Sequence, residues 1–187
     1  MVRLLLALVL ALCSLSLAGS VRTAALQEAT PFPERCPATT PAENEAIVAR
    51  WYEEAITGHD VTVLDEILAP DVVHESGTFP DDPGPRVVLE ALLTGFPDLT
   101  ETMDEVIRAG DTVVVRWTAT GTHAGEFQGA APTGKAATWT GITIFEIGCG
   151  RISRVVTELD ALGRLEQLGL GPVPAATPAN HGPAHAP

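Results

Sequence analysis

The chain has 187 residues, and its 24 acidic residues against 11 Lys and Arg give a formal net charge of −13. This excess of negative charge argues against a nucleic acid partner, because phosphate-backbone binding needs clustered Lys and Arg. Hydrophobic residues make up 45% of the chain, and the part between the two ends, residues 40–170, is long enough for one domain with one core.

The first 20 residues have the pattern of a secretory signal peptide. Arg3 precedes an apolar run from Leu4 to Ala18, which ends at the small residues Ala18-Gly19-Ser20. The run is shorter than the roughly 20 residues that span a bilayer, so we expect cleavage after Ser20 rather than an uncleaved anchor helix. The mature chain is then secreted or extracytoplasmic, without membrane association, and residues 21–39 form a flexible N-terminal arm.

The mature chain keeps two cysteines, Cys36 and Cys149. In an oxidising compartment they can pair as a disulfide. The alternative, which the sequence leaves open, is two inert thiols. Neither cysteine has the CxxC or Cys/His spacing of a zinc site, so no metal is expected.

The first half of the domain predicts helices. Thr40-Pro41-Ala42-Glu43 can form a capping box with proline at the first helical position, and helically spaced apolar residues follow to about Thr57. Asp60 can cap a short second helix. A short strand at 72–74 and a Pro-rich loop then lead to a third helix, which opens at Gly84-Pro85 and ends near Phe96.

From Leu99 onward, apolar residues alternate with polar ones, as in strands. We expect four strands joined mainly by Gly-containing turns, at about 99–108, 112–123, 135–147 and 151–159. Asp160 can cap a terminal helix, and the Pro/Ala-rich residues 171–187 predict a disordered tail. Helices followed by a strand meander predict an α+β domain, in which a cone-shaped, curved antiparallel sheet packs with N-terminal helices around a pocket for a small hydrophobic molecule.

Six segments together carry a family resemblance: Ala69–His74, Phe96–Leu99, Arg116–Gly125, Pro132–Gly134, Gly150–Ile152 and Asp160–Gly169. They resemble the SnoaL-like polyketide cyclase (ester cyclase) family of the nuclear transport factor 2-like superfamily. The resemblance covers nearly all of residues 43–169. It implies the cone-shaped fold of that superfamily, and it is compatible with a homodimer. Characterised members close a ring on a polyketide ester by an intramolecular aldol step, without a cofactor, with an Asp of the last strand as acid and base.

The resemblance also places individual residues. The position of the family's catalytic Asp falls on Thr157, and threonine cannot replace a carboxylate in proton transfer near neutral pH. Two polar pocket positions of the preceding strand fall on Gly141 and Thr143. A third pocket position, which is Asn in the cyclase, falls on His74. This position therefore keeps a polar side chain.

Three residues are candidates for catalysis. His74 ends a strand beside Glu75, where a carboxylate can tune an imidazole; the alternative is a partly exposed, locally bonded histidine. His123 lies among glycines at a strand end and could reach the pocket rim, or could only stabilise a turn. Asp160 is a carboxylate close to the position of the lost acid, with a helix cap as its alternative role.

The candidate ligand-binding residues come from four elements. Alternation places Trp139, Thr143 and Phe145 on one face of the strand at 135–147, which the resemblance identifies as concave. Trp117 of the neighbouring strand and Thr157 of the last strand join them. Tyr52 of the first helix can cover the pocket, and as the single tyrosine it is the one residue that could act as the oxyanion donor of ketosteroid isomerases.

Two functions follow from this sequence. The first is cofactor-independent acid/base chemistry, of cyclase, isomerase or lyase type, on a small hydrophobic carbonyl compound. The second is noncatalytic binding of a small hydrophobic ligand on the same scaffold. Whether the protein is an enzyme stays open at this point, because a fold resemblance does not supply chemistry.

Overall fold

The computed structural model describes residues 36, 38–76 and 82–171. The predicted signal peptide lies outside the described residues, as do most of the predicted arm and tail. The described residues form six helical segments: α2 (Pro41–Arg50), η1 (Trp51–Thr57), η2 (Val61–Val63), α3 (Leu64–Ile67), α4 (Pro85–Gly95) and α5 (Ala161–Leu168). Five strands form the sheet: β1 (Leu68–Ser76), β2 (Thr100–Ala109), β3 (Thr112–Thr122), β4 (Ala136–Gly148) and β5 (Arg151–Leu159).

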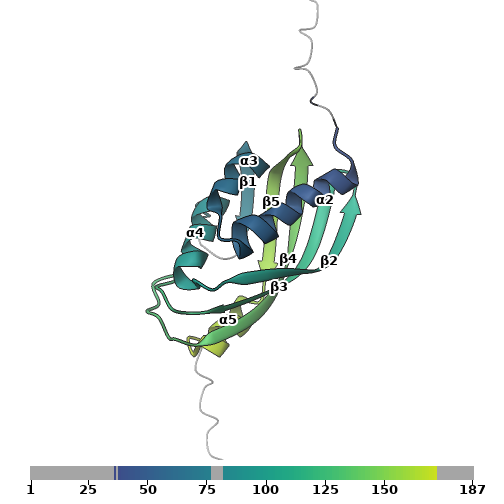
Figure 1. Ribbon diagram of the computed structural model, residues 1–187. Coiled ribbons are helices and arrows are strands. Elements are labelled where there is room, and N and C mark those ends of the chain that lie inside the picture. Colours follow the sequence, from purple (N-terminus) through teal and green to yellow (C-terminus); the bar gives the residue numbers. More distant parts are fainter. Residues whose placement is uncertain (1–35, 37, 77–81, 172–187) are drawn as a thin grey trace, which may run out of the picture. The chain divides into compact units, whose positions relative to one another are not determined.

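The strands form one curved, unclosed sheet in the order β1-β5-β4-β3-β2 (Figure 1). The α+β class and the long meander from β2 to β5 are confirmed. The expectation that the whole sheet is antiparallel is wrong for β1, which runs parallel to β5. The two strands are separated by α4 and the rest of the meander, and such a long crossover permits parallel pairing where a tight turn would not.

Strand β1 is also longer than the predicted strand at 72–74. Its register against β5 shifts between Leu68 and Val73. Pro70 lies in this interval and has no N–H to contribute to a ladder, which fits an irregular strand at the edge of the sheet. The strand continues beyond the irregularity and carries His74 alongside Val155 of β5.

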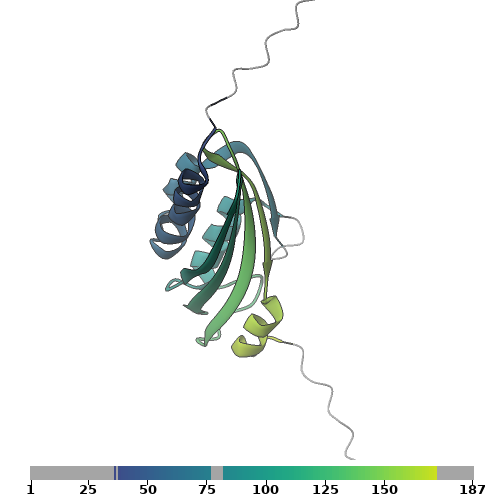
Figure 2. The same cartoon turned by 90° about the vertical axis from the view of Figure 1, so that its right-hand side faces the viewer.

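Helices α2, α3 and α4 lie on the concave side of the sheet, and α5 lies at one end of it (Figure 2). The predicted capping box is present, since the Thr40 side chain accepts from the Glu43 N–H and the Glu43 carboxylate accepts from the Thr40 N–H. Beyond Arg50, the helix widens into the π-helical segment η1, whose Trp51 and Tyr52 face the core.

The core lies between these helices and the inner face of the sheet. Residues of β4 alternate strictly between buried and exposed, as the sequence pattern predicts. Phe145 of β4 is fully buried, and the rings of Trp51 and Tyr52 pack edge-on against it at centroid distances of 5.7 and 6.0 Å. These contacts fix η1 over the middle of the sheet.

The two cysteines meet at the β4–β5 turn. Cys36 and Cys149 are bonded, with their Cα atoms 5.1 Å apart and 113 positions apart in sequence. The bond ties the segment before α2 to the turn. In the part of the chain that the structure describes, no helix combines the length and apolar character required to cross a membrane.

Candidate functional site

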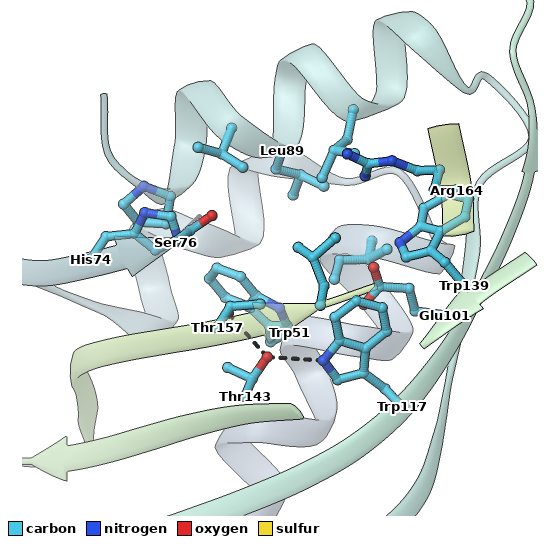
Figure 3. Close-up of a pocket in the computed structure, with 15 residues that line it drawn as sticks. Trp51, His74, Ser76, Leu89, Glu101, Trp117, Trp139, Thr143, Thr157 and Arg164 are labelled. Atoms are coloured by element: carbon cyan, nitrogen blue, oxygen red, sulfur yellow. Dashed lines mark hydrogen bonds between the residues drawn. The ribbon is translucent and has the colours of Figure 1, made fainter. Parts of the chain in front are cut away.

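A narrow cavity of about 60 Å³ lies between the inner face of the sheet, η1 and α4. Most of its wall is apolar or aromatic, from Trp51, Ile56, Pro85, Val88, Leu89, Leu92, Trp117, Trp139 and Leu159. The polar side chains on the wall are His74, Ser76, Glu101, Thr143, Thr157 and Arg164. Figure 3 shows that the polar groups are spread out: His74 and Ser76 lie at one end, and Glu101 and Arg164 lie at the other.

His74 is held by a carboxylate. Its side chain is 5% exposed, and its Nδ1 lies 2.6 Å from Asp82 Oδ1. Asp82 also accepts hydrogen bonds from the backbone N–H groups of Ser76 and Gly84, at 3.0 and 2.9 Å. In the neutral imidazole, an acceptor at Nδ1 places the proton on that nitrogen and leaves the lone pair on Nε2. Nε2 is then the nitrogen that is available to a ligand.

Opposing effects act on the pKa of Asp82. Partial burial raises it, but the hydrogen bonds from His74 and from the two backbone N–H groups outweigh burial, so the pKa lies below its ordinary value. The carboxylate therefore stays ionised at neutral pH and can stabilise an imidazolium at His74.

The partner of His74 differs from the one that the sequence suggested. Glu75, its neighbour in the chain, forms an ion pair with Arg154 at 2.8 Å on the outer face of the sheet. Successive side chains of a strand point to opposite faces, so Glu75 cannot approach the imidazole. The predicted strand ended at His74, whereas β1 continues to Ser76 and so turns Glu75 to the opposite face. The sequence also held no signal that Asp82, eight positions away, would fold back onto His74.

A short hydrogen-bonded chain crosses the floor of the cavity. Trp117 Nε1 donates to Thr143 Oγ1 at 2.9 Å, and the Thr143 and Thr157 hydroxyl oxygens are 3.0 Å apart (Figure 3). Because the indole is only a donor, Thr143 accepts from Trp117 and can pass its own proton toward Thr157. The Thr157 hydroxyl is then free to donate to a ligand.

Gly141 makes this chain possible. A Cβ atom at position 141 would lie 2.2 Å from Cζ2 of Trp117, far inside van der Waals contact. The missing side chain lets the indole lie against β4, where its N–H reaches Thr143. Gly141 therefore shapes the site without contributing a functional group.

Glu101 and Arg164 form the other polar end, and the sequence analysis missed both. Glu101 is half-buried on β2; burial raises its pKa to about 8, although the positive charge of Arg164 opposes the shift. Arg164 of α5 is only 2% exposed. Its guanidinium lies 5.1 and 5.3 Å from the ring centroids of Phe127 and Trp139, distances at which cations bind aromatic faces.

The sequence did contain signals for this pair. Glu101 lies two positions from both Leu99 and Met103, so alternation places it on the same inner face as these apolar residues. Arg164 precedes Leu168 by four positions, which places it on the apolar side of the terminal helix. In both cases the signal was a charged residue on a face that is otherwise apolar.

Four of the six predicted ligand-binding residues lie on the cavity wall: Trp117, Trp139, Thr143 and Thr157. Tyr52 and Phe145 do not line it and belong to the core behind it. Burial and the charge of Glu101 raise the pKa of Tyr52, although its interaction with the Thr143 hydroxyl opposes the shift. The predicted contact of Tyr52 and Phe145 with a ligand stays a prediction, which the lining of this cavity does not support.

His123 and Asp160 do not reach the cavity. His123 is fully buried, with its Nδ1 3.2 Å from the Thr133 hydroxyl and its ring packed against Phe96. It holds together the connection between β3 and β4. Asp160 accepts from the N–H of Gly163 at 2.8 Å and caps α5. Neither lies on the wall that His74 shares, so their role as helpers of His74 stays a prediction without support from the cavity.

A metal site is not formed by the residues that the structure describes, since no three His, Cys, Asp or Glu side chains among them are grouped to hold an ion. The polar groups of the cavity are instead an imidazole with its carboxylate, two hydroxyls, a carboxyl group of raised pKa and a guanidinium. Such groups move protons and bind oxygen atoms of a ligand.

Solved structures similar to this one come from several bacteria. AclR, a candidate hydroxylase from Streptomyces galilaeus, is 27% identical with a TM-score of 0.64, over 72% of this chain and 89% of AclR. TsrD from Streptomyces laurentii is 25% identical with a TM-score of 0.63, over 71% and 98%. IdmH, a candidate polyketide cyclase from Streptomyces antibioticus, is 31% identical with a TM-score of 0.59, over 67% and 98%.

A comparison with curated proteins gives no significant match. The profile of a protein family, in contrast, matches residues 46–168, which include every helix from η1 to α5 and all five strands. That family is described as SnoaL-like polyketide cyclase. The extent of this match and the similar solved structures show that the chain belongs to the SnoaL-like polyketide cyclase family of the nuclear transport factor 2-like superfamily.

Proposed function

We propose that the protein is a cofactor-independent acid/base enzyme of cyclase or isomerase type that acts on a small hydrophobic carbonyl compound, with His74 as the base. The observation that carries the proposal is the pairing of His74 with Asp82 at 2.6 Å on the wall of a mainly apolar cavity. An imidazole oriented by an ionised carboxylate is the arrangement that general base catalysis requires.

The chemical step needs no additional reagent. Nε2 of His74 removes a proton from the carbon next to a carbonyl group, the C–H electron pair forms an enolate, and Asp82 stabilises the resulting imidazolium. In a cyclase the enolate carbon attacks a second carbonyl of the same molecule, and the new alkoxide takes the proton back from His74. In an isomerase the proton returns to a different carbon of the substrate.

The hydroxyl chain supports the same chemistry. Negative charge develops on the carbonyl oxygen as the proton leaves, and fixed hydrogen-bond donors at such a position lower the barrier. Thr157 stands at the end of the chain from Trp117 through Thr143. We assign Thr157 to donate to the enolate oxygen. In this arrangement, the family's acid position keeps a hydrogen-bonding role while proton transfer moves to His74.

The similar solved structures support a reaction of this class, but they do not by themselves identify the reaction. IdmH is a candidate polyketide cyclase, whereas AclR is a candidate hydroxylase. Because two chemistries are associated with one scaffold, the residues of the cavity must decide. The small, mainly apolar cavity favours a small hydrophobic substrate.

We also propose that the protein acts outside the cytoplasm. The charged start, the apolar run and the small residues before Val21 support export, and a disulfide is typical of an oxidising compartment.

Proton exchange tests the catalytic proposal without knowledge of the natural substrate. In deuterium oxide the protein should catalyse exchange of the protons next to the carbonyl of 2-octanone, measured by NMR. His74→Ala should lower this exchange by about 10²–10⁴-fold, and Asp82→Asn should lower it as well. Asp160→Asn is the matched control, because asparagine caps a helix about as well as aspartate, and it should leave the rate unchanged.

A noncatalytic binding protein is the second candidate function. The observation that favours it is the Thr143–Thr157 pair, which leaves the floor of the cavity without a titratable group. Binding of 2-octanone with no exchange above the rate of the His74→Ala variant would establish this alternative and refute the catalytic proposal.

A further inference from the structure

The end of the cavity opposite His74 holds a buried cation without a counter-ion. Arg164 is 2% exposed, and its Nε has no hydrogen-bond partner among the described residues. Figure 3 shows its side chain reaching from α5 toward the cavity, beside Trp139 and Glu101. Burying a charge without a partner costs several kcal/mol, so this arrangement requires an explanation.

The aromatic neighbours account for part of the cost. Phe127 and Trp139 offer ring faces at 5.1 and 5.3 Å, and such contacts stabilise a desolvated guanidinium by up to about 2 kcal/mol. Ring faces, however, do not accept the N–H groups of a guanidinium, which has five donors in a planar fork. The Nε–H of Arg164 therefore still lacks an acceptor among the described residues.

Glu101 does not neutralise Arg164 by direct contact. Among the described residues, the carboxyl group of Glu101 and the guanidinium of Arg164 do not form an ion pair at 4.0 Å or less. The Glu101 carboxyl group also makes no hydrogen bond to another described side chain. Burial also raises its pKa to about 8, so at neutral pH most molecules carry a protonated Glu101. A protonated carboxyl group is a donor and leaves the positive charge of Arg164 uncompensated.

We propose that Arg164 binds a carboxylate group of the substrate, and that the substrate is a slender hydrophobic oxo acid whose carbonyl lies at the His74 end of the cavity. A carboxylate accepts two parallel hydrogen bonds from one guanidinium. The apolar wall between the two ends receives the hydrocarbon part. This inference rests on the proposed function for the position of the carbonyl group, but the carboxylate site is testable by binding alone.

The chain provides its own reporter. It has three tryptophans, and Trp51, Trp117 and Trp139 all line this cavity. Intrinsic fluorescence therefore responds to occupancy of the site. We would titrate a series of straight-chain oxo acids, from 5-oxohexanoate to 9-oxodecanoate, and the methyl ester of each at pH 7.

At the best chain length the acid should bind about 10–100-fold more tightly than its ester, as expected for a charge-assisted hydrogen-bonded pair. Arg164→Met keeps a long side chain against the two rings and removes the charge. It should reduce the ratio of acid to ester affinity to about 1 and change the ester affinity by less than about threefold. Glu101→Gln keeps Arg164 and should retain the preference for the acid.

Arg164→Lys covers the case in which Arg164→Met does not fold, since it keeps the charge and should keep a weaker preference. Equal affinity of the wild-type protein for acid and ester overturns the proposal, and so does an unchanged ratio in Arg164→Met or a lost preference in Glu101→Gln. His74→Ala separates the two levels of inference. It should lower proton exchange by about 10²–10⁴-fold and retain the preference for the acid, so either proposal can fail without the other.

Discussion

Replacing Glu101 by glutamine should stabilise the protein, and the gain should grow with pH. The pKa of Glu101 is about 8 in the folded chain, against 4.5 for a glutamate in water. Between these values the folded chain holds a proton that the unfolded chain releases. Stability therefore falls as pH rises through this window, by up to about 1.4 kcal/mol per pH unit. Glutamine does not titrate and escapes this loss.

The size of the effect follows from the width of the window. From pH 4.5 to pH 8 the upper bound is about 5 kcal/mol. Glu101 is only half-buried, and solvent at the cavity stabilises the ionised form, so we expect about 2–3 kcal/mol. At pH 5 the two proteins should differ by less than about 1 kcal/mol.

Urea unfolding between pH 5 and pH 8.5 measures this difference. Glu105→Gln is the matched control, because Glu105 is an exposed carboxylate on the same strand, and its effect should stay within about 0.5 kcal/mol at every pH. If wild type and Glu101→Gln lose stability in parallel over this range, Glu101 is not desolvated in the folded chain, and the account of the polar end of the cavity is wrong.

Three other predictions follow from the structure. Gly141→Ala places a methyl group 2.2 Å from the Trp117 ring, so it should shift the fluorescence spectrum and lower proton exchange. An alanine at half-buried Gly148, where the nearest side-chain atoms would lie 3.6 Å away, should do neither. Reduction of the Cys36–Cys149 bond opens a loop of 113 positions and should cost about 4–5 kcal/mol in the chain-entropy description; two reactive thiols in the unreduced, denatured protein would exclude the bond. Sequencing of exported protein should find Val21 at the N-terminus, and a chain that still starts with Met1 would contradict cleavage.

Much of the fold could be predicted because its signals are local. Strict alternation in β4 fixed which side chains face the core, and the Thr40–Glu43 capping box marked the start of α2. The parallel pairing of β1 with β5 could not be predicted in this way, because no turn joins the two strands. Their association depends on contacts between segments that are distant in the chain.

The candidate site was partly predictable for the same reason. Trp139 and Thr143 follow from alternation within one strand. The partner of His74 does not, because the loop that carries Asp82 has no period from which its path could be read. Arg164 and Glu101 are intermediate cases. The helical and strand periodicities place their side chains on the inner faces of their elements, but the sequence does not indicate that these two charged residues share one cavity.

The bond between Cys36 and Cys149 also determines how the protein responds to mechanical force. If the described chain is held at Cys36 and Gly171, tension passes through the disulfide and bypasses all residues between the cysteines. Stretching can then release only β5 and α5, about 22 residues, or on the order of 75 Å of extended chain. After reduction the release would be on the order of 450 Å. Because β5 pairs with β1 on one side and β4 on the other, the oxidised protein must break two ladders to release even this short segment.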